Sequence, residues 1–155
     1  MEYTAAVPSP LGTLILTSDG QALTGLSIGS KSPCENASLP LLDSVRAWLS
    51  VYFEGRDPGP VPCPLSPSGT AFQRQIWRLL LEIPYGETLS YGDLAVRSGR
   101  SSKSAQAVGQ AVGKNPIAIL IPCHRVLGRN GSLTGYAWGT DRKKALLDLE
   151  SGNDL

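Results

Sequence analysis

The residues best suited to chemistry are three consecutive side chains, Cys123, His124 and Arg125, which follow the apolar run 117–121 and Pro122. A cysteine reacts as its thiolate, and neighbouring basic groups favour that form. A lone buried cysteine is usually an inert small hydrophobic residue, and a lone histidine is usually a satisfied core residue. The three adjacent groups weaken that interpretation and predict a nucleophilic Cys123.

The run 117–121 is predicted to be a buried extended segment that delivers the cysteine at its end. Because adjacent residues of an extended segment point to opposite sides, His124 reaches the Cys123 sulfur only through a water or a local turn. Deprotonating the thiol completely supplies about 1.4 to 2 kcal/mol, so orientation and leaving-group stabilisation must supply the rest.

Three elements are expected before this run. Residues 13–28 predict a β-hairpin around Asp19-Gly20, and apolar residues at helical spacing predict a helix over residues 41–52. The stretch 57–69 contains five prolines and is predicted to be an extended linker. We therefore expect one domain over residues 1–66 and a second over residues 67–155.

The second half is expected to be mostly helical. One helix spans the apolar stripe from Phe72 to Ile83. A capping box, in which Ser90 and Asp93 exchange side-chain-to-backbone bonds, opens the next, which ends near Gly99. Ser102 is expected to cap a helix over 103–113. The last two make a helix-turn-helix candidate, although small residues on the last helix equally fit tight packing against another helix.

Composition limits the remaining possibilities. Cys34 and Cys63 are expected to be inert, like most lone cysteines, and no CxxC spacing occurs. The chain begins without the features of a signal peptide. No apolar run approaches the ~20 residues that cross a bilayer. A soluble, cytoplasmic protein with no membrane partner is expected. Residues 1–66 carry 3 Lys+Arg against 6 Asp+Glu and residues 67–155 carry 11 against 7, so the second half can meet a polyanion or simply be unevenly charged.

Six segments, in this order, resemble sequences of the O6-alkylguanine-DNA alkyltransferases, also called methylated-DNA:protein-cysteine methyltransferases. They are SPLGTL at 9–14, GTAFQRQIW at 69–77, IPYGETLSYGDLA at 83–95, AVGQAVGKNP at 107–116, IPCHRV at 121–126 and NGSLTGYAWG at 130–139. The resemblance covers about residues 3 to 150, and the joint occurrence is highly specific.

The resemblance implies an α+β protein with a small N-terminal α/β domain of ribonuclease-H-like shape and a C-terminal winged helix-turn-helix domain. It also implies a reaction on double-stranded DNA that contains O6-alkylguanine, with O4-alkylthymine as a further possible substrate. The second helix of the motif enters the minor groove, the guanine is flipped out, and the cysteine thiolate takes its alkyl group. A stable thioether results, so the protein is consumed.

Roles follow for five catalytic residues. Cys123 matches the nucleophile, His124 the base that acts through water, and Glu150 the carboxylate that orients the histidine. Tyr91 matches the tyrosine that donates to guanine N3, and Asn115 matches the asparagine that braces the turn before the active-site loop. Without the resemblance, Glu150 would read as a solvated acid, Tyr91 as a half-buried aromatic and Asn115 as a turn residue.

Further positions are matched to the ligands. The carbonyls of Cys123 and Val126 are expected to accept from the guanine amino group, and the Ala137 N–H is expected to face guanine O6. The expected DNA contacts are Ser104, Ala105, Gln106, Ala107, Gly109 and Arg125.

Two positions depart from the family pattern. Gln106 stands where many members have an arginine that fills the gap left by the flipped base, which predicts weaker DNA affinity or lesion capture. Trp138 stands where several members have glycine, and its ring either reshapes the pocket or simply packs.

Two other functions remain open. Cys123 and His124 with Glu150 could form a cysteine hydrolase, which would recover its thiol after each turnover. A non-enzymatic damage-binding protein is the other alternative, and the presence of Cys123 argues against it. Because the chain has one histidine and three scattered cysteines, no metal site is expected, and no cofactor is expected either. Nothing in the sequence signals oligomerisation, so we expect a monomer without an obligate protein partner.

Overall fold

The computed structural model describes residues 2–29, 36–133 and 135–152 of the chain, so Cys34 lies outside the described residues. The chain forms two compact units, each assembled from separate stretches. The first unit comprises residues 1–68, 116–118 and 148–155, and the second comprises residues 69–115 and 119–147. The first unit holds a three-stranded sheet and the second is mostly helical, so the expected α+β class is confirmed.

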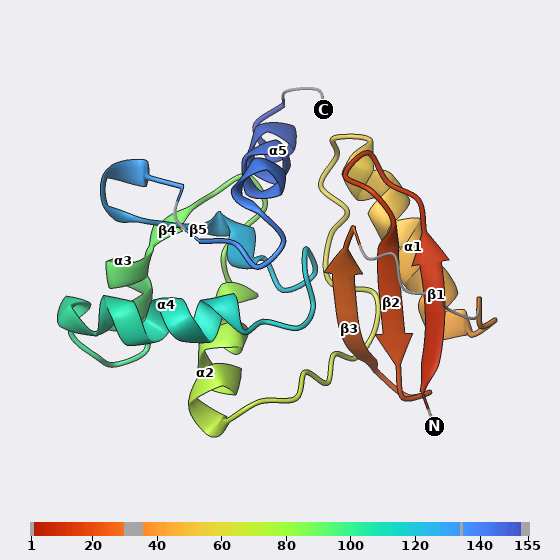
Figure 1. Cartoon of the computed structure of the whole chain (residues 1–155), viewed down its shortest axis with the longest axis horizontal. Helices are drawn as coiled ribbons and strands as arrows, with labels where there is room; N and C mark the ends of the chain where they lie inside the picture. The colour runs from red at the N-terminus through yellow and green to blue at the C-terminus, as the bar shows by residue number, and fades with distance from the viewer. Residues whose placement is uncertain (1, 30–35, 134, 153–155) are drawn as a thin grey trace. The chain divides into compact units, whose positions relative to one another are not determined.

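The first unit is built on an antiparallel sheet in the order β1-β2-β3 (Figure 1). Its strands are β1 (Tyr3–Val7), β2 (Leu14–Ser18) and β3 (Leu23–Ile28). The expected hairpin is confirmed as β2 and β3, whereas the first strand was not expected. The turn is fixed by Asp19, whose carboxylate accepts from the backbone N–H groups of Gln21 and Ala22 at 2.9 Å, and by Gly20 with φ +98°. Glycine tolerates that left-handed conformation.

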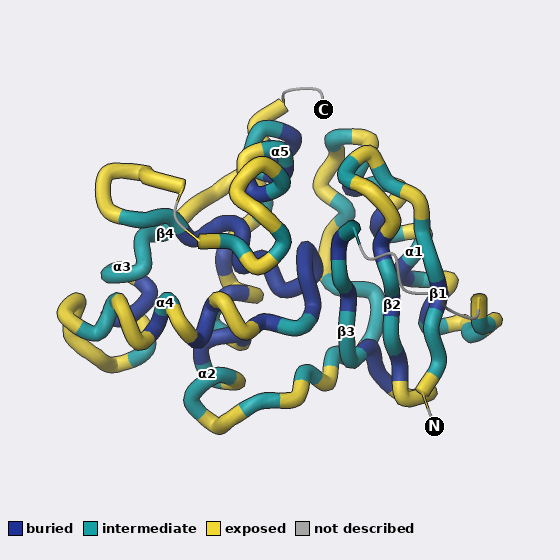
Figure 2. The backbone as a smooth tube through the Cα atoms, viewed as in Figure 1, coloured by how far each residue is buried: buried dark blue, intermediate teal, exposed yellow. Residues whose placement is uncertain are grey.

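Helix α1 (Pro40–Phe53) lies against one face of this sheet (Figure 1) and confirms the predicted helix. Proline at its first position fits the helix start, because its missing N–H would be unbonded there. Its buried stripe, Leu42, Val45, Leu49 and Tyr52, follows helical spacing. Figure 2 shows this buried face beside the buried strand positions, which together make the core of the first unit.

The free edge of β3 is covered by two segments from elsewhere in the chain. Leu23 donates to the Pro64 carbonyl at 2.9 Å and accepts from Ser66 at 2.8 Å. Leu26 donates to the Pro116 carbonyl and accepts from Ala118, both at 3.0 Å. The proline-rich stretch is therefore bound to the sheet instead of acting as a free linker. A proline lacks a donor but keeps its carbonyl, and covering an edge strand prevents association through it.

The second unit contains short helices and one two-stranded parallel ladder, β4 with β5. Its elements are α2 (Ala71–Leu80), β4 (Leu89–Ser90), α3 (Tyr91–Arg97), η1 (Ser102–Ser104), α4 (Ala105–Gly113), η2 (Cys123–Arg125), β5 (Val126–Leu127) and η3 (Arg129–Gly131), and α5 (Thr140–Glu150) begins here and ends in the first unit. Trp77 is buried at the centre and donates from Nε1 to the Ala111 carbonyl at 2.8 Å. This bond ties α2 to α4.

Some predicted helix ends need correction. Ser90 accepts from the Asp93 N–H at 3.0 Å, but the structure gives only this half of the expected capping box. A complete capping box lies instead at Thr70 and Gln73, before α2. Ser101, and not Ser102, provides a cap, because a 3₁₀ turn precedes α4. A serine run offers several equivalent caps, and residue type alone does not choose among them.

Within the described residues, every helix is too short or too polar to span a membrane.

Candidate active site

Cys123 opens the 3₁₀ turn η2 and is 3% exposed. Its N–H donates to the Ile121 carbonyl at 2.7 Å, and its own carbonyl accepts from the Val126 N–H. The preceding run 117–121 is buried, as expected, but it forms turns instead of an extended segment. A short apolar run shows that a segment is buried without fixing its conformation. Hydrogen bonding decides that conformation.

Asn115 makes the bond that closes this turn. The Asn115 side chain is buried, and its Nδ2 donates to the Ile121 carbonyl at 2.9 Å. Ile119, between them, has φ +70°, a left-handed conformation that is strained for a β-branched residue and costs about 1 to 3 kcal/mol. The surrounding bonds hold this strained residue three positions before Pro122 and four before Cys123.

Burial raises the pKa of the Cys123 thiol from 9.0 to about 11. A hydrogen bond from the Asn115 side chain opposes this effect, and so does the positive charge of Lys143. Desolvation disfavours a buried anion, whereas donors and cations favour it. The site therefore holds the sulfur as a thiol while placing two thiolate-stabilising groups around it.

His124 is completely buried within the second unit. Because Cys123 and His124 share a 3₁₀ turn with three residues per turn, their side chains are not forced to opposite sides as in a strand. Glu150 is 8% exposed and accepts a 2.6 Å hydrogen bond from the Tyr52 hydroxyl within the first unit. Its expected role toward the histidine stays a prediction.

Arg125 has a structural place that the sequence did not reveal. It is 8% exposed, donates from Nη1 to the Ile83 carbonyl at 2.7 Å, and lies 5.8 Å from the Tyr85 ring centroid. The structure thus gives this guanidinium an intramolecular partner, and its expected contact with DNA stays a prediction. Ile83 lies beyond the end of α2, where its carbonyl needs a donor.

The small residues of α4 do not all pack inward. Val108, Ala111 and Val112 are buried, whereas Gln106 and Ala107 are exposed and Ala105 and Gly109 are intermediate. The helix thus buries one face against its neighbours and leaves a smooth, small-residue face open. The packing interpretation therefore holds for the buried face, and the approach of a partner to the open face stays a prediction.

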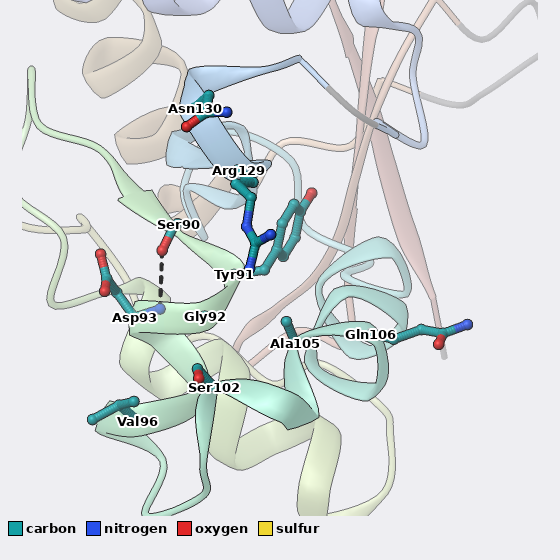
Figure 3. A pocket seen from close by; sticks show the side chains of 10 residues that line it. All are labelled: Ser90, Tyr91, Gly92, Asp93, Val96, Ser102, Ala105, Gln106, Arg129 and Asn130. Carbon is teal, nitrogen blue, oxygen red and sulfur yellow. Dashed lines mark hydrogen bonds between the residues drawn. The ribbon is translucent and has the colours of Figure 1, made fainter.

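Two hollows meet along this open face. One, of about 570 Å³, lies between the start of α3, the start of α4 and η3, and Figure 3 shows Tyr91, Arg129 and Asn130 around it. The other, of about 540 Å³, is lined by Tyr91 and by Ala137, together with α4. Tyr91, Ala105 and Gln106 line both hollows. The two hollows thus bring Tyr91 and Ala137 together with Ala105, Gln106 and Gly109, whereas Cys123 and Val126 line neither of them.

The two positions that depart from the family pattern have different surroundings. Gln106 is exposed, and its amide points away from Arg129 (Figure 3). The Trp138 ring packs edge-to-face on the Tyr136 ring, with centroids 5.3 Å apart. The backbone carbonyl of Trp138 accepts a hydrogen bond from the Arg142 side chain. This contact supports the packing interpretation of Trp138.

Sequence reasoning missed Lys143, which is completely buried. Its Nζ lies 5.7 Å from the centroid of the Tyr91 ring, and its charge acts on Cys123. The sequence did carry a signal for Lys143, because it stands at helical spacing with Leu146 and Glu150. The structure shows that all three residues are buried. Among residues 2–29, 36–133 and 135–152, no group of three or more His, Cys, Asp or Glu side chains could hold a metal ion.

Comparison with known proteins agrees with this arrangement. The family description "6-O-methylguanine DNA methyltransferase, DNA binding domain" matches residues 71–152. The Haemophilus influenzae methylated-DNA–protein-cysteine methyltransferase is 43% identical over 158 residues, which cover 96% of this chain and 86% of that protein. The Mycobacterium tuberculosis protein of that name is 42% identical over 155 residues, which cover 97% and 93%.

Solved structures give the same result. The crystal structure of Mycobacterium tuberculosis O6-methylguanine methyltransferase has a TM-score of 0.87 and 39% identity, covering 100% of this chain and 96% of that one. A crystal structure of Mycobacterium tuberculosis OGT in complex with DNA has a TM-score of 0.87 and 41% identity, with coverages of 98% and 94%. The chain therefore belongs to the methylated-DNA–protein-cysteine methyltransferase family.

Proposed function

We propose that this protein repairs alkylated DNA by moving the alkyl group of O6-alkylguanine onto Cys123 in one irreversible turnover. The observation that carries the proposal is the shared hollow around Tyr91, Ala137 and α4, in the unit that also presents Cys123 on a braced turn. Family membership and the DNA complex of a relative support it.

The chemistry needs a base, a nucleophile and a stabilised leaving group. The thiol proton passes through a water to His124, and the Cys123 sulfur forms a bond to the alkyl carbon. The bond from that carbon to guanine O6 breaks, and its electron pair stays on O6. The Tyr91 hydroxyl donates to guanine N3 and so stabilises the departing base. The product is a thioether, which explains single use.

The remaining roles are supporting ones. Asn115 braces the turn, Glu150 orients His124, and the backbone of Val126 and Ala137 contacts the guanine. For the DNA, we propose that α3 and α4 form a helix-turn-helix with the open face of α4 in the minor groove, and that β4, β5 and η3 form its wing. A small-residue face permits the close approach that a narrow groove requires. The first unit has the proposed ribonuclease-H-like shape.

We propose that the two predicted domains have different roles. The residues from 67 onward would carry catalysis and DNA binding, and those from 1 to 66 would support them. We propose a monomer as the active species, acting on a duplex that carries the lesion.

The test is mass spectrometry after mixing the protein with a duplex containing O6-methylguanine. One methyl group should appear on the peptide bearing Cys123 in stoichiometric amount, and Cys123→Ala should take none. Cys63, which is half-buried, provides the control, because Cys63→Ala should react like wild type. A cysteine hydrolase would instead recover its thiol, and a damage-binding protein would leave the lesion in the DNA.

A further inference from the structure

Arg129 on η3 is a charged residue that the proposed mechanism leaves unused. It is exposed and lines the hollow of about 570 Å³ together with Tyr91 and Gln106 (Figure 3). Among the residues that the structure describes, none forms a hydrogen bond or an ion pair with its guanidinium. A guanidinium carries five donors in a rigid fork, so this one is available to a ligand.

The pairing of β4 with β5 explains why Arg129 lies at the same hollow as Tyr91. The two strands are parallel, and Leu127 lies opposite Ser90. Because parallel strands run in one direction, both chains leave the ladder at the same end. One chain continues directly into Tyr91, and the other continues through one residue to Arg129.

The turn that carries Arg129 is closed by its own hydrogen bonds. The Gly128 N–H donates to the Ser132 carbonyl at 2.8 Å, and the Ser132 hydroxyl donates to the Arg129 carbonyl at 3.1 Å. Asn130 and Gly131 have φ +60° and +75°, a left-handed conformation that asparagine and glycine adopt more readily than other residues. A bonded backbone leaves mainly the side chain to be ordered on binding, which lowers the entropic cost.

The hollow also contains one carboxylate. Asp93 is exposed and lines the hollow from α3, and it forms no ion pair with Arg129 in the described part of the chain. The other polar side chains of the lining, which include Ser102, Gln106 and Asn130, are uncharged. An anionic group is therefore attracted to the η3 side of the hollow and repelled from the α3 side.

The anion that fits best is a phosphodiester of DNA. Ala105 and Gln106 line this hollow and also the second one, so the two hollows continue into each other along the open face of α4. A small free anion fills only part of a hollow of this size, whereas a DNA strand that follows α4 occupies both. The planar guanidinium can bind two oxygens of one phosphate at once.

We propose that Arg129 is a positioning residue that binds one phosphate of the lesion-bearing strand in this hollow and so holds that strand at Tyr91. The inference rests on the proposed function, in which Tyr91 donates to the alkylated guanine. The bound phosphate therefore lies close to the lesion along the strand. Contacts to phosphates fix the register of a protein on a duplex without reading its sequence.

The test combines Arg129→Gln with duplexes in which one phosphate is neutralised. Each duplex carries O6-methylguanine and a single methylphosphonate at one of the three linkages on either side of the lesion. All proteins also carry Cys123→Ala, so that the lesion persists while Kd is measured. On the duplex with all its phosphates, Arg129→Gln should bind about five- to tenfold more weakly than its parent, as expected for one lost phosphate contact.

The neutralised duplexes should identify the phosphate that Arg129 binds. At one linkage, the methylphosphonate should weaken binding of the parent about five- to tenfold and change that of Arg129→Gln by less than about twofold. Arg97→Gln is the matched control, because Arg97 is exposed on α3 and lines neither hollow. It should lose as much affinity at that linkage as the parent does.

Two results would overturn the proposal. One is an Arg129→Gln protein that binds the duplex with all its phosphates as tightly as its parent. The other is an equal loss of affinity for Arg129→Gln and its parent at every linkage. Should Arg129→Gln not fold, Arg129→Ala replaces it in the same comparison.

The rate of methyl transfer gives a second readout and separates this inference from the proposed function. With Cys123 present, Arg129→Gln should transfer more slowly at low duplex concentration and within about threefold of wild type at saturation, because the contact forms before the reaction. A saturating rate more than about tenfold lower, with an unchanged Kd, would contradict a positioning role. Wild type that took no methyl group would refute the proposed function, whereas normal transfer without coupling at any linkage would refute only the role of Arg129.

Discussion

The nucleophile is stored in its unreactive form. Burial raises the pKa of the Cys123 thiol to about 11, so little thiolate exists near neutral pH in the free protein. This shift of two pKa units corresponds to about 2.7 kcal/mol, which the bound site must offset before the thiolate can form. This arrangement suits a protein that reacts only once, because the sulfur is protected from unrelated electrophiles until the alkylated guanine binds.

The raised pKa predicts how stability depends on pH. Below pH 9 the thiol is protonated in both folded and unfolded chains, so its full contribution is present. Between pH 9 and 11 the unfolded chain loses this proton first, so stability falls as pH rises. Relative to Cys123→Ala, wild type should lose up to about 2 to 3 kcal/mol across this window, measured by urea unfolding. Parallel curves for the two proteins would refute the shift.

Asn115 should matter for both stability and reaction. Asn115→Ala leaves the buried Ile121 carbonyl without its 2.9 Å donor, which should lower the free energy of unfolding by about 1 to 3 kcal/mol. The turn carrying Cys123 loses its brace, so alkyl transfer should slow as well. Gln110→Ala, on the exposed face of α4, is the control for chemical unfolding. Equal stabilities of the two variants would show that the brace contributes nothing.

At the scale of elements, strands and helices with regular apolar spacing could be predicted from the sequence, whereas the hydrogen-bond partners of irregular segments could not. The hairpin around Asp19 and the helix over 41–52 follow from turn chemistry and apolar spacing, and both are confirmed. The run 117–121 was correctly expected to be buried and wrongly expected to be extended, because Asn115 fixes it from outside the run. Arg125 was expected to contact DNA, and the inward bond of its guanidinium to the Ile83 carbonyl could not be seen in the sequence.

The start of α2 offers a matched pair of glycine substitutions. A Cβ at Gly69 would lie 2.5 and 2.7 Å from atoms of the Trp77 ring, which is fixed in the core. Gly69→Ala should therefore lower the free energy of unfolding by about 1 to 3 kcal/mol through overpacking. Gly113→Ala, at the end of α4 with open space around it, should be neutral or stabilising by up to about 1 kcal/mol. Thermal unfolding of both proteins checks the pair.

At the scale of the whole molecule, the two units depend on distant parts of the chain. The bond from the Tyr52 hydroxyl to the Glu150 carboxylate joins residues 98 positions apart within the first unit. Tyr52→Phe removes a buried donor to a charged group and should cost about 1.5 to 3 kcal/mol in urea unfolding. If Glu150 orients His124 as proposed, transfer should slow too. Tyr3→Phe, on strand β1, serves as the control, and a similar loss there would argue against a specific bond.

Assembly from separate stretches also separates charge more strongly than the linear sequence does. The halves at residue 66 carry −3 and +4. Grouped by unit, the first holds 3 Lys+Arg against 9 Asp+Glu and the second holds 11 against 4, giving −6 and +7. The difference arises because the acidic end of the chain, with Asp148, Glu150 and Asp154, belongs to the first unit. A net charge of +1 therefore conceals a strongly basic unit, which is the one that carries α4.

This separation predicts strong dependence of DNA binding on salt. Of the eleven cations, Arg125 and Lys143 are buried and Arg142 is half-buried, so the other eight are exposed and can contact phosphates. With only three such contacts, affinity for an undamaged duplex should fall roughly 40-fold between 50 and 200 mM salt, because each contact adds about −0.9 to the log–log slope. Lys103→Gln, beside α4, should reduce the slope by about one, whereas Arg56→Gln in the first unit should leave it unchanged. An affinity that does not vary with salt would show that the basic unit does not bind the phosphate backbone.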